Sequence, residues 1–386
     1  MAKYLTHDLI ITLVVFQSVV LLFILSNIRI TRRARRHFPP PVFPLVSILV
    51  PARNEERNIA GCVQSLLEQD YPSFEVLVLD DQSGDNTRLI LEKIAVSQPR
   101  LRVLEGEPLT GDRVGKNWAC SQLAHQAGGE LFFFTDADTL HQPQTLRTIV
   151  TALVGEQADL LTGFPRQEVH TWGERLLVPF FSWAMYCFYP LALAYRLRLP
   201  ALSFAVGQMM LFRQEAYQAI GGHGGVSSSI VEDLMLARQI KASGMRWRVT
   251  YAADLISCRM YHKNHEAMHG FTKNLFAAFD FRLLPFLFIY IWLAVMFWEP
   301  LIILLLMIFG QAVQAQVNYL AICIGLSFLL WLIPYLEMGI PFGLALIYPF
   351  TILSNEVAAF LSLGNSLAGR LSWKGRKIAQ ARWKWL

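Results

Sequence analysis

Two acidic residues, Asp136 and Asp138, stand one residue apart directly after the apolar stretch 131–135. The stretch contains three Phe and is typical of a strand that is buried on both faces, as central parallel strands are. Carboxylates at i and i+2 beyond such a strand can converge on one hard cation, which takes oxygen ligands. The pair therefore predicts a metal and phosphate site at a strand end, where open α/β sheets bind ligands. The alternative is an acidic turn that caps the following helix.

Three further clusters place polar side chains just beyond a predicted strand or at a predicted helix start: Pro51-Ala52-Arg53-Asn54-Glu55, Asp80-Asp81 with Ser83 and Asp85, and Gly115-Lys116-Asn117. Paired acids can hydrogen-bond a base or a ribose, and a Gly followed by a cation at a helix start suits a diphosphate. Taken singly, such acids are usually caps and Gly-Lys is usually a turn. If all four clusters lie on the same edge of one sheet, together they predict a site for a nucleoside diphosphate and its divalent metal.

The elements that must position these residues alternate between strand-like and helix-like segments from residue 46 to about 259. Short apolar runs predict strands at residues 46–51, 74–79, 101–104, 131–135, 159–163, 209–212 and 247–251. Segments with apolar residues at helical spacing lie between them, at residues 58–69, 87–96, 117–127 and 144–154. This alternation predicts an α/β domain with a mostly parallel sheet and helices on both faces.

The composition and the charge pattern indicate a membrane protein. Of the 386 residues 54% are hydrophobic, whereas ordinary soluble proteins have about 45–50% apolar residues. Residues 9–28 are long enough for a bilayer helix, and the Arg-rich residues 32–36 follow them instead of the cleavage site of a signal peptide. Five Arg in residues 29–36 against a single Lys before the span place the N-terminus outside and the following domain in the cytoplasm.

More apolar segments follow the domain. Residues 286–309 and 319–335 are predicted spans, and residues 342–363 are a weaker third. Three spans would put the tail outside, whereas the six Lys or Arg of residues 370–384 favour the cytoplasm. We expect a cytoplasmic tail and a third segment that is re-entrant or interfacial. Without these six and the five Arg after the first span the net charge falls from +5 to −6, so nucleic-acid binding has little support.

The predicted organisation has five parts: a transmembrane anchor (1–30), a basic and Pro-rich linker (31–45), a cytoplasmic domain (46–275), a membrane region with two to three helices (276–369) and a basic aromatic tail (370–386). Within the domain, residues 176–199 are apolar but interrupted by Pro179 and Pro190. A crossing there would also put the later acids on the opposite side from Asp136. We therefore expect residues 176–199 to be interfacial or buried. The protein would be integral to the inner or plasma membrane if it is bacterial.

The order of the motifs resembles glycosyltransferase family 2, inverting enzymes with a GT-A fold. The matching pieces are Val46-Ser-Ile-Leu-Val-Pro-Ala-Arg-Asn-Glu-Glu56, Leu79-Asp-Asp-Gln-Ser, Gly115-Lys116, Thr135-Asp-Ala-Asp138, Gly207-Gln208, Ile220-Gly-Gly-His223 and Val231-Glu-Asp-Leu234. The N-terminal span, the C-terminal spans and the tail Trp373-Lys-Gly-Arg376 resemble the membrane-bound branch that contains ceramide glucosyltransferases and the carotenoid- and hopanoid-associated glycosyltransferases.

The resemblance implies roles on the donor side of the site. The base and ribose of a nucleotide sugar would be held by Asp80 and Asp81, together with Pro51, Ala52 and Glu55. Mg²⁺ or Mn²⁺ on the diphosphate would be ligated by Asp138, with Asp136 beside it. Lys116 would lie near the diphosphate.

On the acceptor side, Asp233 of the pair Glu232-Asp233 would be the general base that deprotonates the acceptor hydroxyl. Attack of that hydroxyl on the anomeric carbon inverts this centre. Without the resemblance, the pair suits the acidic first turn of a helix. The Gln/Arg-x-x-Arg-Trp motif of many relatives is missing from residues 260–274. The other acceptor-side candidates are Gln208, His269, Lys273, Trp373 and Arg376, although the two tail residues also suit a membrane-interface anchor.

The sequence thus favours a membrane-bound hexosyltransferase that moves a sugar from a nucleotide donor to a lipid such as a ceramide, carotenoid or hopanoid. Three alternatives remain. A processive polysaccharide synthase would need a translocation channel. A zinc metalloprotease would use His265 and His269 as ligands and Glu266 as base, in the pattern His-Glu-x-x-His. A non-catalytic scaffold would have no need of the full set of acids.

Overall fold

The computed structural model describes residues 2–109, 111, 113–311, 316–370, 372–373, 376–377 and 383–386. The chain divides into two compact units. The first, here called the sheet unit, comprises Arg29–Glu168 and Leu191–Met260. The second, the helical unit, comprises Met1–Ile28, Val169–Pro190 and Tyr261–Leu386. Residues 169–190 and 261–275 thus group with the helical unit, whereas the sequence assigned them to the domain that carries the site.

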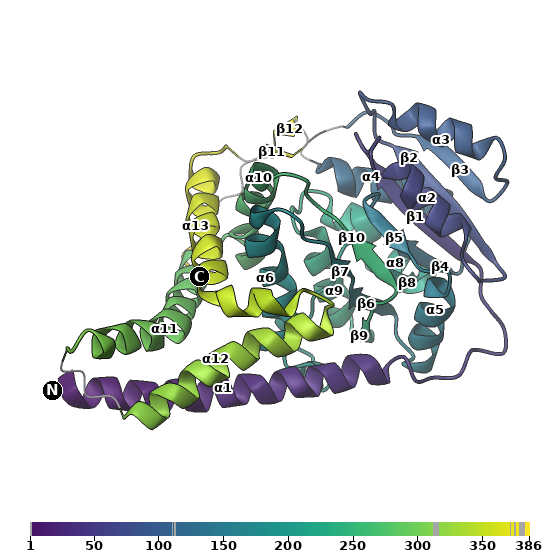
Figure 1. The fold of residues 1–386 in the computed structure, drawn as a ribbon. Coiled ribbons are helices and arrows are strands. Elements are labelled where there is room, and N and C mark those ends of the chain that lie inside the picture. Colours follow the sequence, from purple (N-terminus) through teal and green to yellow (C-terminus); the bar gives the residue numbers. More distant parts are fainter. Residues whose placement is uncertain are drawn as a thin grey trace. The chain divides into compact units, whose positions relative to one another are not determined.

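A seven-stranded sheet with the order β3-β2-β1-β4-β8-β6-β9 organises the sheet unit (Figure 1). Its strands are β1 (Val46–Ala52), β2 (Phe74–Asp80), β3 (Leu101–Glu105), β4 (Leu131–Phe134), β6 (Leu160–Phe164), β8 (Met210–Arg213) and β9 (Trp247–Tyr251). Neighbouring strands are parallel except at β8, which is antiparallel to both β4 and β6. The predicted α/β class with a mostly parallel sheet is confirmed.

Apolar side chains alternate between the two faces of the sheet and bury both. On one face, Phe133 of β4 packs in a core with α2 (Ile59–Leu67) and α5 (Thr145–Gly155). On the other face, Phe132 and Phe134 contact Tyr217 of α8 (Gln214–Ala219), with ring centroids 5.6 and 5.2 Å apart. The whole of β4 is buried, which explains its uninterrupted apolar sequence.

Shorter elements complete the sheet unit. They are α3 (Thr87–Ala95), α4 (Gly115–Gln126), α7 (Leu191–Ala194), η1 (Pro200–Leu202), η2 (Gly222–Val226), α9 (Glu232–Ala242) and the strands β5 (Thr139–His141), β7 (Arg166–Gln167) and β10 (Ile256–Cys258). The last three strands form a small sheet with the order β5-β10-β7. Because β5 starts one residue after Asp138, this small sheet supports the segment that carries the two acids.

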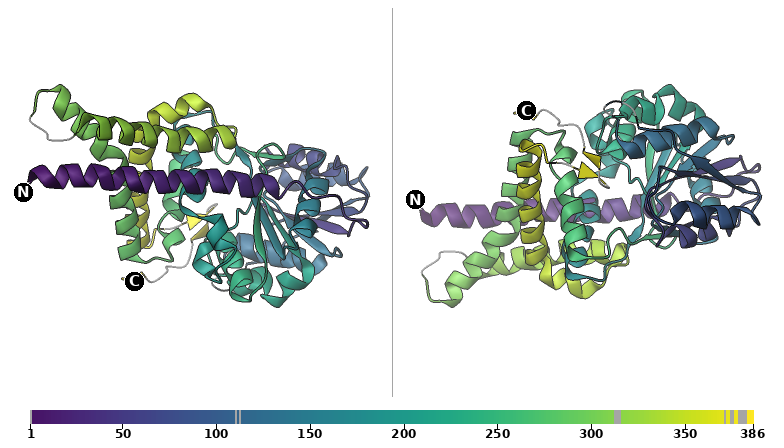
Figure 2. Two further views of the ribbon diagram at one scale, coloured as in Figure 1. Left: turned by 90° about the horizontal axis from the view of Figure 1, so that it is seen from below. Right: turned by 90° about the horizontal axis from the view of Figure 1, so that it is seen from above.

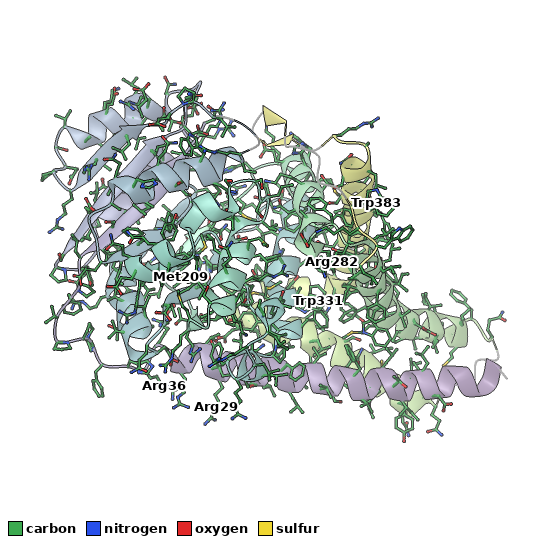
Figure 3. The ribbon with its side chains drawn as sticks, turned by 180° about the vertical axis from the view of Figure 1, so that it is seen from behind. Arg29, Arg36, Met209, Arg282, Trp331 and Trp383 are labelled. Atoms are coloured by element: carbon green, nitrogen blue, oxygen red, sulfur yellow. The ribbon has the colours of Figure 1, made fainter. Side chains whose placement is uncertain are left out.

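The helical unit contains α6 (Trp172–Phe188), α10 (Asn264–Asn274), η3 (Ala277–Phe279), α11 (Leu283–Ile308), α12 (Val317–Glu337), η4 (Phe342–Ile347) and α13 (Tyr348–Leu367). It also contains most of α1 (Ala2–Arg33). Among the described residues, four segments are long and apolar enough to cross a membrane: Asp8–Arg33, Leu283–Ile308, Val317–Glu337 and Phe342–Leu367. One long apolar helix near the N-terminus and three in the C-terminal region agree with the prediction. Figure 3 shows Arg29 and Arg36 near the end of α1.

Two prolines inside these helices leave backbone carbonyls without their helical partner, because proline has no N–H to donate to residue i−4. Pro300 frees the carbonyl of Met296, to which Nε2 of buried Gln17 donates over 3.4 Å. Pro334 frees the carbonyl of Leu330, to which Nε1 of Trp183 donates over 2.9 Å. Side chains from α1 and α6 therefore provide donors to the carbonyls that the prolines of α11 and α12 leave free, as membrane burial requires.

The end of the chain returns to the start of α11. The carbonyls of Lys384 and Trp385 accept hydrogen bonds from the backbone N–H groups of Leu283 and Leu284, over 2.8 and 3.1 Å. Nζ of Lys384 also lies 3.4 Å from Oδ2 of Asp280. These contacts satisfy N–H groups that would otherwise have no partner in the first turn of α11.

Candidate active site

The polar clusters predicted from the sequence lie at the carboxyl ends of neighbouring strands. In the parallel register of β1 and β2, Ala52 is opposite Asp80, and the N–H of Asp81 donates to the carbonyl of Ala52 over 2.8 Å. The strand β4, which precedes Asp136, pairs with the other side of β1. Residues far apart in the sequence are thus brought to one edge of the sheet.

Hydrogen bonds join the loop after β1 to the loop after β2. Asn54 donates its N–H to Oγ of Ser83 over 2.9 Å and accepts from the N–H of Gly84 over 2.8 Å. Arg53 donates to the carbonyl of Asp81. The N–H of Glu55 donates to Oγ1 of Thr87 over 2.8 Å. These contacts fix the shape of the expected nucleotide-binding edge, where Asp80 and Asp81 are both buried.

Lys116 is presented by the first turn of α4, which begins at Gly115 as the sequence predicted. The next residue, Asn117, is fully buried and donates through Nδ2 to the carbonyls of Val226 and Ser229, each over 2.9 Å. The loop that Asn117 holds leads directly into α9. The start of α4 and the start of α9 are therefore tied together.

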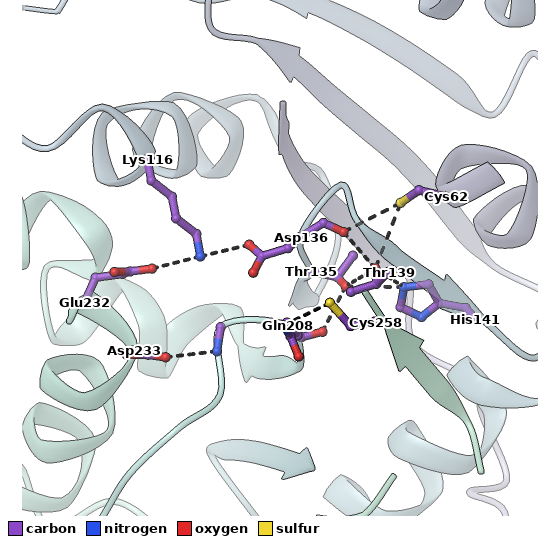
Figure 4. Close-up of polar contacts among 11 residues, drawn as sticks. Cys62, Lys116, Thr135, Asp136, Thr139, His141, Gln208, Glu232, Asp233 and Cys258 are labelled. Atoms are coloured by element: carbon purple, nitrogen blue, oxygen red, sulfur yellow. Dashed lines mark hydrogen bonds and ion pairs between the residues drawn. The ribbon is translucent and has the colours of Figure 1, made fainter. Parts of the chain in front are cut away.

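Lys116 joins an acid of the turn after β4 to an acid in the first turn of α9 (Figure 4). Its Nζ lies 2.8 Å from Oδ1 of Asp136 and 3.0 Å from Oε1 of Glu232. Burial alone would lower the pKa of Lys116, but the two carboxylates outweigh that effect and hold this pKa well above its usual value. Lys116 therefore remains charged and links the donor-side acid to the predicted base pair.

Asp233 has the environment of a general base. Its Oδ2 accepts from the N–H of Gly207 over 3.1 Å, and its Oδ1 accepts from the N–H of Leu234 over 2.7 Å. Burial and the neighbouring charge of Glu232 raise the pKa of Asp233 to about 7, against the lowering effect of Lys116. A carboxyl with a pKa near neutrality accepts a proton efficiently at physiological pH.

Asp136 and Asp138 have the chemistry that a hard divalent cation requires. Burial, and after it the charges of both carboxylates, raise the pKa of the Cys258 thiol, so both acids act on the same buried group. Mg²⁺ and Mn²⁺ sites often combine one or two carboxylates with substrate phosphates. Because one oxygen of Asp136 is paired with Lys116, Asp138 is the better candidate for direct ligation.

The acceptor-side candidates are divided between the two units of the chain. The side chain of Gln208 is buried, where Oε1 accepts from Gln167 over 2.8 Å and Nε2 contacts Sγ of Cys258 at 3.1 Å. His269 and Lys273 belong to α10 of the helical unit. The backbone of Trp373 lies in β11 (Ser372–Trp373) and that of Arg376 in β12 (Arg376–Lys377), but their side chains are outside the described part of the structure. The acceptor-side roles of His269, Lys273, Trp373 and Arg376 stay predictions.

The zinc alternative has no support beyond its motif. His265 and His269 do share α10, but a zinc protease site needs three protein ligands. No group of three or more His, Cys, Asp or Glu residues that could hold a metal ion occurs in the described parts of the chain. The carboxylate of Glu266 instead accepts the backbone N–H of His262 over 3.0 Å.

Several residues shape the site through a backbone group or a buried side chain. Gly207 acts through its backbone N–H, and a Cβ at this position would lie 3.0 Å from Nζ of Lys116. Below Phe134, buried His223 pairs through Nδ1 with the hydroxyl of Tyr217 over 2.8 Å. The family motifs Gly207-Gln208 and Gly-Gly-His were signals for Gly207 and His223, whereas no sequence signal distinguished Tyr217 from an ordinary helix residue.

Known proteins resemble this chain in the region of the site. Residues 47–221 match the model of Glycosyl transferase family 2. The matched stretch contains most of the motifs from which the sequence predicted this family. Glycosyltransferase AglE of Haloferax volcanii is 30% identical over 122 residues, which are 31% of this chain and 39% of that protein. The 4,4'-diaponeurosporenoate glycosyltransferase of Staphylococcus aureus strain USA300 is 26% identical over 234 residues, 60% of each chain. The matched stretch thus spans about two fifths to three fifths of these relatives.

A solved structure extends the likeness beyond the matched domain. The mannosyltransferase PcManGT of Pyrobaculum calidifontis, in complex with GDP-Man and Mn²⁺, is 18% identical. The similarity covers 93% of this chain and 99% of that chain, with a TM-score of 0.52. At this identity the comparison establishes the fold, which is α/β and GT-A-like.

Proposed function

We propose that this protein transfers a sugar from a nucleotide-diphosphate sugar to a lipid acceptor, with inversion at the anomeric carbon. The observation that carries the proposal is the position of Lys116, which bridges Asp136 on the donor side and Glu232 beside Asp233. A scaffold without activity has no use for this partly buried arrangement of charges. The two carboxylates share one cation, and Asp233 has a pKa suited to proton transfer.

In this proposal each residue has a separate task. The edge formed by Ala52, Asp80 and Asp81 holds the base and ribose. A divalent metal held by Asp138 and Asp136 would neutralise the leaving diphosphate. The carboxylate of Asp233 takes the proton of the acceptor hydroxyl as its oxygen bonds to the anomeric carbon and the bond to the diphosphate breaks. The N–H of Gly207 orients that carboxylate.

Two observations support a lipid acceptor. The part of the chain that the structure describes has four helices that are long and apolar enough to cross a membrane. The relative from Staphylococcus aureus that matches 60% of the chain is named for an acceptor, 4,4'-diaponeurosporenoate. A processive polysaccharide synthase remains the second candidate. The missing Arg-Trp motif and the small number of apolar helices weigh against it.

The contacts of the tail support a cytoplasmic C-terminus. Backbone hydrogen bonds hold Lys384 and Trp385 at the start of α11. The described residues contain no further candidate span between α1 and α11. In this proposal the start of α11 would therefore be cytoplasmic, like the domain that carries the site. The chain would then cross the membrane an even number of times after residue 283.

The third apolar segment is the one proposed not to cross. In Figures 1 and 2, α13 lies across the direction of α1. Nδ2 of Asn355 in α13 donates to the carbonyl of Leu176 in α6 over 2.8 Å, and Oγ of Ser362 accepts from the N–H of Phe276 over 3.0 Å. These contacts hold α13 against segments that precede α11. They support an interfacial position for α13.

The function can be tested by comparing lipid extracts of cells with and without the gene by mass spectrometry. A lipid that carries an additional hexose only when the gene is present supports the proposal. A new extracellular polymer without any glycolipid would favour the polysaccharide synthase instead.

A further inference from the structure

A buried polar cluster lies directly behind the two acids of the proposed metal site. It consists of Thr135 at the end of β4 and of Thr139 and His141 in β5, and all three side chains are at most 5% exposed. Oγ1 of Thr139 lies 2.9 Å from Nε2 of His141, and Oγ1 of Thr135 lies 3.3 Å from the same nitrogen (Figure 4). Both threonine hydroxyls therefore contact the same nitrogen of His141.

Each threonine connects this cluster to a different segment of the site. The hydroxyl of Thr139 donates to the carbonyl of Asp136 over 2.7 Å. The hydroxyl of Thr135 donates to the carbonyl of Gln208 over 2.9 Å. The two hydroxyl oxygens also lie 3.0 Å from each other. A hydroxyl has one proton, so when both protons are directed to the two carbonyls, both oxygens accept from His141. The proton of the imidazole must then be on Nε2, between the two hydroxyls.

The other imidazole nitrogen agrees with this assignment. Nδ1 of His141 is buried and has no hydrogen-bond partner among the described residues. An unpartnered lone pair is tolerated better than an unpartnered buried N–H, which is rare in folded proteins. Burial also lowers the pKa of His141 to about 3, so the ring is neutral at physiological pH.

The two connections lead to opposite sides of the reaction. Asp136 belongs to the proposed metal site and binds Lys116. Gln208 follows Gly207, whose N–H orients Asp233. We propose that neutral His141 is a positioning residue that holds the metal-side segment and the base-side segment at a fixed separation. The inference deepens the proposed function and rests on it for the roles of the two segments.

The two connections can be separated by removing one hydroxyl at a time. Thr139→Val should weaken Mn²⁺ binding to the purified full-length protein about tenfold or more, as loss of a supporting contact does, and leave the acceptor KM unchanged. Thr135→Val should leave Mn²⁺ affinity unchanged and lower kcat, because the segment of Gly207 shifts. Thr148→Val is the matched control, since this threonine on α5 also donates to a backbone carbonyl, that of Gln144, over 2.8 Å.

Replacement of the imidazole tests the centre of the cluster. His141→Leu should impair both Mn²⁺ binding and kcat, and His141→Gln, which restores an N–H near the position of Nε2, should recover both in part. In ¹⁵N-histidine spectra of the unmodified protein, His141 should show a protonated Nε2 and a bare Nδ1 from pH 5 to 8.

The inference can be tested independently of the proposed function, because the spectra and the Mn²⁺ titration do not require sugar transfer. A proton on Nδ1, a His141 that titrates between pH 5 and 8, or wild-type Mn²⁺ affinity in Thr139→Val would overturn the inference. Absence of sugar transfer together with the expected spectra and Mn²⁺ affinities would overturn only the proposed function.

Discussion

Nζ of Lys116 lies 3.0 Å from Oε1 of Glu232, although the two residues are more than a hundred positions apart in the sequence. The contact exists because Asn117 binds the loop that leads into α9. It brings a fixed positive charge beside Asp233, whose pKa it lowers, while Glu232 raises the same pKa. The balance of these two charges sets the protonation of the proposed base.

The pH dependence of the reaction should follow Asp233. Because burial and Glu232 raise the pKa of its carboxyl to about 7, kcat/KM should fall about tenfold for each pH unit below that value and level off above it, as expected for one essential base. A rate measured from pH 5 to 9 checks this. A profile that is flat from pH 5 to 7 would contradict the assignment.

Substitutions of the two neighbouring charges should shift this profile in opposite directions. Glu232→Gln removes a negative charge that raises the pKa of Asp233, so the acidic limb should move to lower pH. Lys116→Met removes a positive charge that lowers the same pKa, so the limb should move to higher pH. If the acidic limb moves equally in both variants, or if each variant moves it opposite to the expected direction, another group is the base.

The activation of the enzyme by a divalent metal should require Asp138. Treatment with EDTA should abolish turnover, and added Mn²⁺ or Mg²⁺ should restore it. Asp138→Asn should raise the Mn²⁺ concentration for half-maximal activity at least about tenfold, the order of magnitude seen when a metal site is disturbed. Asp70→Asn is a suitable control, because Asp70 is an exposed carboxylate paired with Arg147. Full activity of Asp138→Asn at low Mn²⁺ would rule out its role as a ligand.

The side of the C-terminus can be measured by cysteine labelling. All five native cysteines are buried. Single cysteines at exposed Ser97 in the sheet unit, Gln316 between α11 and α12, and Leu386 in the tail give three reporters. A membrane-impermeant maleimide should label the Ser97→Cys and Leu386→Cys variants from the cytoplasmic side and the Gln316→Cys variant from the other side. Labelling of Leu386→Cys from the same side as Gln316→Cys would show that α13 crosses the membrane.

The stability of the packing around α12 should depend on Trp183. This side chain stacks on Trp331 with ring centroids 4.0 Å apart and donates to the carbonyl that Pro334 leaves free. Trp183→Phe keeps an aromatic ring but removes the donor, which should cost about 1–3 kcal/mol, as loss of a buried hydrogen-bond partner does. Thermal unfolding in detergent should show a lower Tm, whereas Trp172→Phe, at a 59% exposed position, should not change it.

The sheet could be predicted because its strands are buried. Uninterrupted apolar runs such as Leu131–Phe134 have no other place in a folded domain, and the strand bounds agree with the structure to within two residues. The antiparallel direction of β8 could not be predicted, because an apolar run indicates a buried strand but not the direction in which it pairs with its neighbours. The small sheet that contains β5 was also missed, because strands of two or three residues show no periodicity.

The candidate site could be predicted in part for a similar reason. Acids and a lysine that follow strands or start helices can be recognised from residue type and position. The hydrogen bond from Gly207 to Asp233 and the contacts of His141 depend on loops that meet only in the folded chain. A backbone N–H has no sequence signal. A buried histidine has the same sequence signal as an exposed one.

The central claim is most directly tested by the anomeric configuration of the product. Purified full-length protein should be incubated with Mn²⁺, a set of α-linked nucleotide sugars and a lipid extract, and the product should be examined by NMR. The account predicts a β-linked glycolipid that forms with the unmodified protein and is lost, or reduced by at least about a thousandfold, in Asp233→Asn. A product with retained configuration, or an Asp233→Asn variant with unchanged activity, would contradict it.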